Sequence, residues 1–110
     1  MDAVDLADVV DRADVGAVGV TLWGRDVSPA LEDAKTSWAS TSLDLGPLDS
    51  VVVVITDLPG TTLGETDGSL VRIDRDAAGW GWSLDGRSPG IDLRTVLAHE
   101  LGHVLGLSHD

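Results

Sequence analysis

All three histidines of this 110-residue chain fall near its end, and their spacing restricts how that segment folds. His99 and His103 are four residues apart, which on an α-helix places both imidazoles on one face. On an uninterrupted helix His109 would lie about 15 Å from His99, so the helix must end if the three are to meet. Gly106 suits that turn, because glycine adopts the left-handed conformation that terminates helices.

This spacing predicts a zinc site with His99, His103 and His109 as ligands. Two imidazoles one helical turn apart can bind one ion, and a third leaves a fourth position for water, whose pKa then falls to about 7. Glu100 cannot easily join the same coordination sphere, so we predict that it acts as the general base toward the zinc-bound water. The alternative is that three unrelated histidines happen to lie in this helix and the loop after it, which would not explain their spacing.

The helix that carries this motif shows the clearest periodicity in the chain. Asp92 is the predicted N-cap. Apolar residues follow at intervals of three and four: Leu93, Val96, Leu97, Leu101, Val104 and Leu105. His99 and His103 fall to one side of this stripe, outside the predicted core.

The composition limits the number of domains, the kinds of partner and the residues that could bind a metal. With 110 residues, 43% of them apolar, we expect a single domain over residues 1–110. A net charge of −12 argues against a nucleic-acid partner, while the many carboxylates leave calcium open as a second metal. Cysteine is absent, so zinc must use histidine and carboxylate ligands. No segment has the length of a membrane span.

Several elements are predicted ahead of the motif helix. Two apolar runs read as strands, the second buried on both faces at the centre of a sheet. Ser28 and Pro29 read as the N-cap and the first residue of a helix. Asp67-Gly68 favours a hairpin turn, and the four tryptophans are assigned to the core. The ranges are a strand over 16–23, a helix over 29–40, a strand over 51–55, hairpin strands over 61–66 and 69–74, and a loop or short irregular strand over 77–90.

The segment Ile91 to Asp110 resembles the active-site helix of the metzincins, most closely that of matrixin-type peptidases. Upstream, Gly68 to Trp82, with Asp74 and Trp80, is similar to the strand and loop before that helix in bacterial matrixin-like exoproteins. The resemblance implies that the three histidines bind zinc, that Glu100 is the catalytic base and that Gly106 is the turn glycine.

The resemblance also implies an α/β (α+β) fold. It has a twisted, mixed, mostly parallel sheet and two long helices, with the active-site helix at the C-terminus, so that the chain forms the N-terminal half of a metzincin fold. An edge strand matching about Thr61 to Glu65 would pair with an extended peptide substrate. The family further implies secretion. Since residues 1–5 do not resemble a signal peptide, the chain would then be a mature portion or a fragment.

Two features depart from the family pattern. Matrixins place a Met-containing turn after the third histidine, whereas the only methionine here is Met1 and the chain stops at Asp110. They also pair an aspartate with a glutamate three residues later for calcium, where this chain has Asp74 and Ala77, so a calcium site would be incomplete.

These features predict a zinc-dependent metalloendopeptidase that cleaves peptide or protein substrates. The alternative is a non-catalytic zinc-holding module of a larger acidic secreted protein, and a third possibility is an acidic calcium-binding adhesion domain. Glu100 favours the enzyme, since a module that only holds zinc has no need of it.

Overall fold

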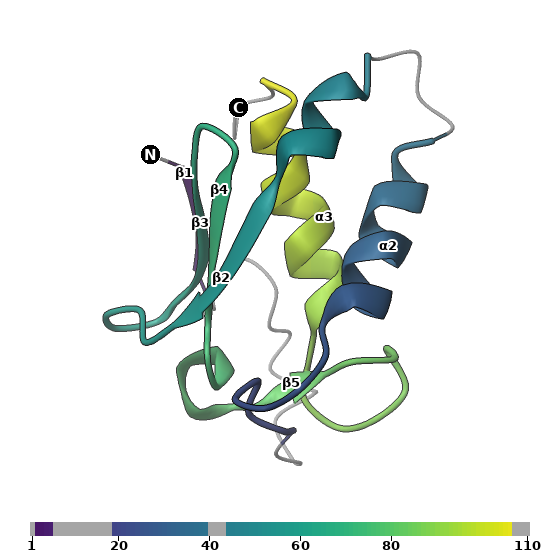
Figure 1. The fold of residues 1–110 in the computed structure, drawn as a ribbon. Coiled ribbons are helices and arrows are strands. Elements are labelled where there is room, and N and C mark those ends of the chain that lie inside the picture. Colours follow the sequence, from purple (N-terminus) through teal and green to yellow (C-terminus); the bar gives the residue numbers. More distant parts are fainter. Residues whose placement is uncertain (1, 6–18, 40–43, 107–110) are drawn as a thin grey trace.

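The computed structural model describes residues 2–5, 19–39 and 44–106 of the chain (Figure 1). Its α-helices are α2 (Ser28–Ser37) and α3 (Leu93–Val104), and its 3-10 helices are η2 (Gly46–Ser50) and η3 (Ala77–Gly79). Its strands are β1 (Asp2–Asp5), β2 (Val52–Thr56), β3 (Thr62–Asp67), β4 (Leu70–Asp74), β5 (Trp82–Ser83) and β6 (Ile91–Asp92). The α+β class with two helices and a mixed sheet is therefore confirmed.

The main sheet has the strand order β1-β3-β4-β2. β3 and β4 form the predicted antiparallel hairpin, β2 runs parallel to β4, and β1 runs antiparallel to β3. Among the described strands of this sheet, parallel pairing does not predominate as expected, because both the hairpin and β1 contribute antiparallel ladders. β5 and β6 form a separate parallel pair that leads into α3.

α3 lies between the main sheet and α2 (Figure 1). Its predicted apolar stripe is confirmed, since Leu93, Val96, Leu97 and Leu101 have no exposed surface. Burying each such side chain contributes about 1.5–3 kcal/mol, so this stripe is a main source of the fold's stability. None of the described helices is long and apolar enough to cross a bilayer.

The start of α2 differs from the prediction. Ser28 is the first residue of the helix, not its N-cap, and Val27 takes the cap position without a side-chain hydrogen bond. The backbone N–H of Ser28 instead donates to the Asp26 carboxylate over 2.9 Å, and this bond lowers the pKa of Asp26. Asp26 thus satisfies one of the orphan donors at the helix start.

The predicted central position of the 51–55 strand is wrong. β2 pairs with β4 on one side only within the described residues, and Val52 and Val54 are 56% and 40% exposed. Val53 and Ile55 pack against the core from the opposite face. A continuous apolar run does not reveal whether both faces or only one is covered, which explains the error.

The predicted strand over 16–23 is reduced, within its described part from residue 19, to an isolated antiparallel bridge between Val20 and Trp82. Gly81 lies at this crossing with a φ of +75°, and a Cβ there would overlap the backbone of Gly19. Only glycine fits so close a backbone approach.

The core assignment of the tryptophans holds for three of them. Trp82 is fully buried and donates its indole N–H to the Asp74 carbonyl over 2.7 Å, and Trp38 and Trp80 pack partly buried against the core. Trp23, however, is 55% exposed.

Candidate metal centre

Capping at both ends sets the limits of α3. The Asp92 carboxylate accepts the backbone N–H of Arg94 and the hydroxyl of Thr95, each over 3.0 Å, which confirms Asp92 as the N-cap. At the other end the helix stops at Val104, and Gly106 follows with a φ of +95°. The predicted glycine turn after the second histidine is therefore present.

His99 and His103 lie side by side on α3. Their ring centroids are 4.8 Å apart, with the ring planes at 69°, and His99 is exposed while His103 is half-buried. Two imidazoles so close on one helix face suit a shared metal ion, and zinc prefers such nitrogen ligands. The predicted third ligand, His109, lies outside the described residues.

Glu100 lies deeper in the molecule than the sequence indicated. Its side chain is fully buried and points to β3, where the hydroxyl of Thr66 donates to its Oε1 over 2.9 Å. Gly64 stands next to it, and a Cβ at that position would come within 3.0 Å of Oε2. The missing side chain of Gly64 therefore makes room for the carboxylate between α3 and β3.

A cavity of about 440 Å³ opens beside the second histidine. His103 and Val104 of α3 line one side of it, and Thr66 and the β3–β4 turn line another. The residue that holds the Glu100 carboxylate therefore borders the same cavity as a predicted zinc ligand.

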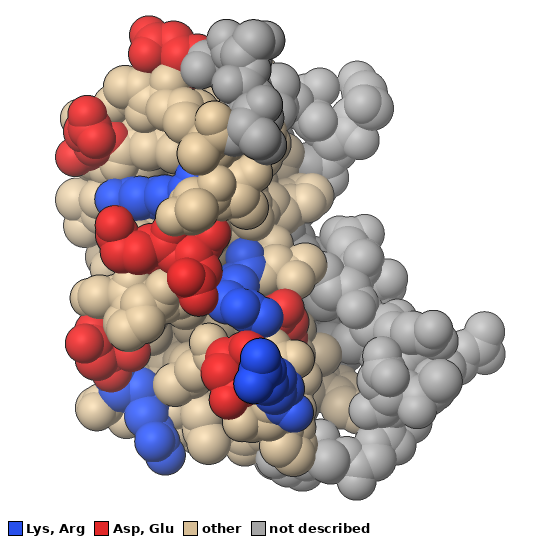
Figure 2. All heavy atoms as spheres, turned by 90° about the vertical axis from the view of Figure 1, so that its right-hand side faces the viewer, with Lys and Arg blue, Asp and Glu red and all other residues tan. Residues whose placement is uncertain are grey.

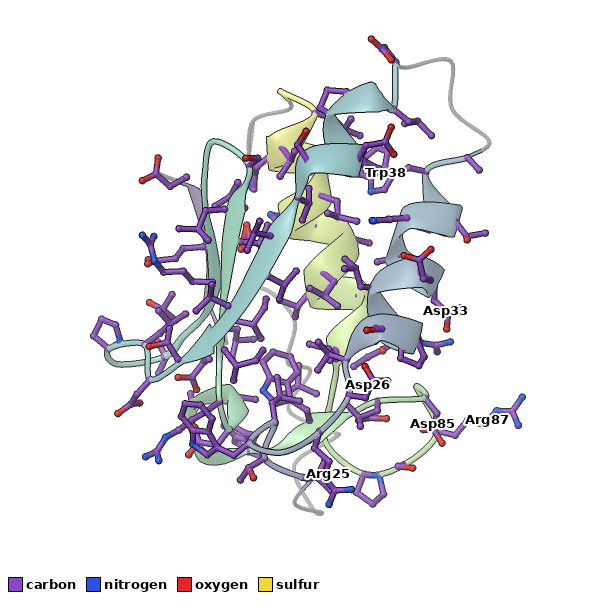
Figure 3. The ribbon with its side chains drawn as sticks, in the orientation of Figure 1. Arg25, Asp26, Asp33, Trp38, Asp85 and Arg87 are labelled. Atoms are coloured by element: carbon purple, nitrogen blue, oxygen red, sulfur yellow. The ribbon has the colours of Figure 1, made fainter. Side chains whose placement is uncertain are left out.

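α2 packs against α3, the helix that carries His99 and His103. The indole N–H of Trp38, just after α2, donates to the carbonyl of Ala98 over 3.0 Å, and Figure 3 shows Trp38 near the end of that helix. Arg94 links the two helices, with 3.7 Å between its guanidinium and the Asp33 carboxylate. Ala98 directly precedes His99, so α2 restrains the backbone from which the first imidazole projects.

The face that carries α2 mixes both signs of charge, as Figure 2 shows, with Lys and Arg side chains among Asp and Glu. Lys35 pairs with Glu32 at 3.5 Å on this helix, and on the sheet Arg72 pairs with Glu65 at 3.4 Å. Each of these two ion pairs places a basic group next to a carboxylate.

Asp74, the aspartate of the incomplete calcium pattern, has a structural role. It is buried, with Oδ1 accepting the N–H of Leu58 over 2.7 Å and Oδ2 accepting that of Ala78 over 2.8 Å. The pKa of the neighbouring Asp76 is raised, first by burial. Its hydrogen bond with Asp74 and the repulsion between the two carboxylates raise it further. The two Asp74 hydrogen bonds therefore hold the loop after β2 and the loop after β4.

Sequence reasoning missed Thr66 and Gly64 as neighbours of Glu100. A glycine inside a strand often marks a close approach by another group, so Gly64 offered a usable signal. Thr66 offered none, because a threonine in a strand is common and its partner lies 34 residues away in sequence.

Most of the chain is similar to known proteins. The matrixin family model (peptidase M10) matches residues 27–110. Over 92 residues the chain is 33% identical to matrix metalloproteinase-19 of Mus musculus, an alignment that covers 79% of this chain but only 16% of that protein. No solved structure matches the chain. With a family match that includes the whole motif helix, the chain belongs to the matrixins, a family of zinc-dependent metallopeptidases.

Proposed function

We propose that this chain carries the catalytic zinc site of a secreted metalloendopeptidase, with His99, His103 and His109 as ligands and Glu100 as the general base. The observation that carries the proposal is the pair of imidazoles 4.8 Å apart on α3, with Glu100 next to the first of them in sequence. Family membership supports a protein or peptide as the substrate.

Zinc held by His99, His103 and His109 would leave one position for water and would lower the pKa of that water to about 7. Glu100 would accept the proton that this water releases, acting as a general base, and would return it to the leaving amine as a general acid. The hydrogen bond from Thr66 to Oε1 holds the Glu100 side chain in one rotamer. The carboxylate is therefore already oriented before the proton is transferred.

Among the described residues β3 is not the expected edge strand, because β1 pairs with it on the side opposite β4. The peptide substrate is proposed to take the place of β1 on that side, extended along β3 over the stretch from Thr61 to Glu65. Peptides commonly add a strand to the side of a sheet, with backbone hydrogen bonds for affinity and side-chain pockets for specificity. The Glu100 carboxylate contacts β3 at Gly64 and Thr66. A peptide on this strand would thus pass next to the general base.

Zinc content and peptide cleavage, measured together, test these roles. After dialysis against trace zinc, the unmodified chain should hold about one zinc per molecule, His103→Ala should hold far less, and Glu100→Gln should remain nearly fully loaded. Cleavage should be lost in both variants. A His103→Ala protein as well loaded as the unmodified chain would refute the ligand assignment, and cleavage retained in Glu100→Gln would refute the base.

A zinc-holding module without catalysis is the second candidate. The complete burial of Glu100 against Thr66 favours it, because a buried, hydrogen-bonded carboxylate can serve to join α3 to the sheet. In that case the zinc-loaded chain would cleave no peptide, and Glu100→Gln would change its unfolding free energy alone.

A further inference from the structure

The cavity beside His103 lies at the C-terminal end of α3, where η2 and the β3–β4 turn form its other walls. Its volume of about 440 Å³ is within the range of about 300–1,000 Å³ that is usual for ligand pockets. One wall is an imidazole that is proposed to bind zinc. A side chain held in this cavity would therefore lie next to the proposed reaction.

The lining of the cavity is part apolar and part polar. Pro47 and Val104 bring apolar surface, and Ser50 and Ser69 each bring a hydroxyl. Lysine and arginine fit such a lining, because a long apolar stem ends in a charged group that donates hydrogen bonds. A wholly aliphatic side chain would instead cover the hydroxyls without bonding to them.

Charge separates the basic side chains from the acidic ones. Asp67 borders the cavity, and no lysine or arginine is among the described residues that line it. Within the described part of the chain, the Asp67 carboxylate has no ion-pair partner. It is therefore available to attract an ammonium or guanidinium group, and it repels a second carboxylate.

The strand register indicates which residue of a peptide would reach the cavity. β1 pairs with this side of β3, with Asp2 opposite Thr66 and Val4 opposite Gly64. Opposite residues of a ladder direct their side chains to the same face, and the Thr66 hydroxyl is turned toward Glu100 on α3. In this register, the peptide side chain opposite Thr66 would point toward the cavity. It belongs to the residue two positions before the one that lies beside Gly64 and the general base.

We propose that the cavity is a specificity pocket for a lysine or arginine side chain on the N-terminal side of the cleaved bond, with Asp67 as the counter-charge. This assignment rests on the proposed function, which supplies the peptide and its place along β3. Asp67 would select the substrate without touching the reacting atoms. Its loss should change which peptides bind and leave the proton transfer to Glu100 unaffected.

Three blocked hexapeptides test the pocket. They share the sequence Ala-Lys-Ala-Val-Thr-Ala except at the second residue, which is lysine, norleucine or glutamate, and norleucine keeps the stem of lysine without its ammonium group. The protein carries Glu100→Gln so that no peptide is cleaved. Displacing β1 costs the same for each peptide, so this cost cancels in a ratio of Kd values. Lysine should bind about fivefold more tightly than norleucine, and glutamate should bind most weakly.

A change of charge at the cavity should remove this preference. With Asp67→Asn, which keeps the size of the side chain, the lysine and norleucine peptides should bind almost equally. Asp57→Asn is the matched control, because it removes the same charge from an exposed residue at the other end of β2 and should keep the preference. Equal Kd values while Asp67 is present, a preference that survives Asp67→Asn, or no binding by any of the peptides would overturn the proposal.

The shape of the cavity is tested separately. Ser50→Phe places a bulky side chain at an exposed residue of its lining. It should weaken the lysine and norleucine peptides several-fold relative to the same peptide with alanine at the second residue, which does not need the space. Unchanged relative affinities would show that the long side chains bind elsewhere.

Failure of the pocket and failure of the proposed function can be told apart. The binding ratios do not depend on cleavage, so they report on the pocket even if the chain proves not to be a peptidase. If it is one, Asp67→Asn should lower kcat/KM about fivefold for the lysine peptide and little for the norleucine peptide. An active enzyme that cleaves both peptides equally well would contradict the pocket and leave the zinc chemistry intact.

Discussion

Glu100 is a carboxylate in a fully buried position, and its burial depends on the hydroxyl of Thr66. Thr66→Val keeps the shape of the side chain and removes the donor, so the buried acceptor loses a hydrogen bond. We expect the unfolding free energy to fall by about 1–3 kcal/mol in urea denaturation. Thr62→Val, on the same strand but partly exposed, is the matched control and should change it much less. Equal losses would indicate a general effect on β3.

Asp76 provides a pH-dependent prediction. Burial and Asp74 raise its pKa in the folded protein. A carboxyl with a raised folded pKa contributes stability below the unfolded pKa of about 3.9, and this contribution is lost as pH rises through the folded pKa. Ionised Asp76 therefore weakens the fold at neutral pH.

Asp76→Asn should consequently raise the thermal unfolding midpoint at pH 7, and the gain should shrink as the pH falls toward about 3.9. Asp49→Asn makes the same change of charge at an exposed position on η2 and should give little gain. An advantage for Asp76→Asn that grows as the pH falls would contradict the sign of this argument.

The stability of α3 depends on the cap at its first turn. Asp92→Ala removes the acceptor for the Arg94 N–H and the Thr95 hydroxyl, and losing an N-cap of this kind costs about 0.5–2 kcal/mol. We expect weaker zinc binding too, because a frayed helix holds His99 and His103 less firmly. Asp92→Asn keeps a capping oxygen and should behave close to the unmodified chain in chemical denaturation and zinc titration.

The elements also show how far sequence periodicity reaches. The 3.6-residue pattern predicted α3 and α2 with small errors at their ends, because each helix buries one apolar stripe. The strands were predicted less well. Val51 to Ile55 and Gly16 to Trp23 are alike in composition, yet the first forms β2 and the described part of the second makes a single bridge. Strand pairing depends on distant partners, which a local pattern cannot specify.

At the scale of the whole molecule, the position of α3 between the sheet and α2 decides how the site is built. The spacing of His99 and His103 was sufficient to predict that the two imidazoles meet, because both belong to one helix. The setting of Glu100 was not predictable, since it arises where α3 meets β3. Site residues on one element can thus be predicted from sequence, whereas contacts between layers require the structure.

The hydrogen bond between Trp38 and Ala98 gives the molecule an optical reporter. Indole emission shifts with the strength of the bond made by its N–H, and Ala98 moves with the backbone that carries His99. Zinc titration should therefore change tryptophan fluorescence in proportion to metal bound, with no added label. Trp38→Phe should remove most of this change, and Trp23→Phe, at an exposed position, should preserve it. Should Trp38→Phe retain the full response, the signal would have to come from another tryptophan.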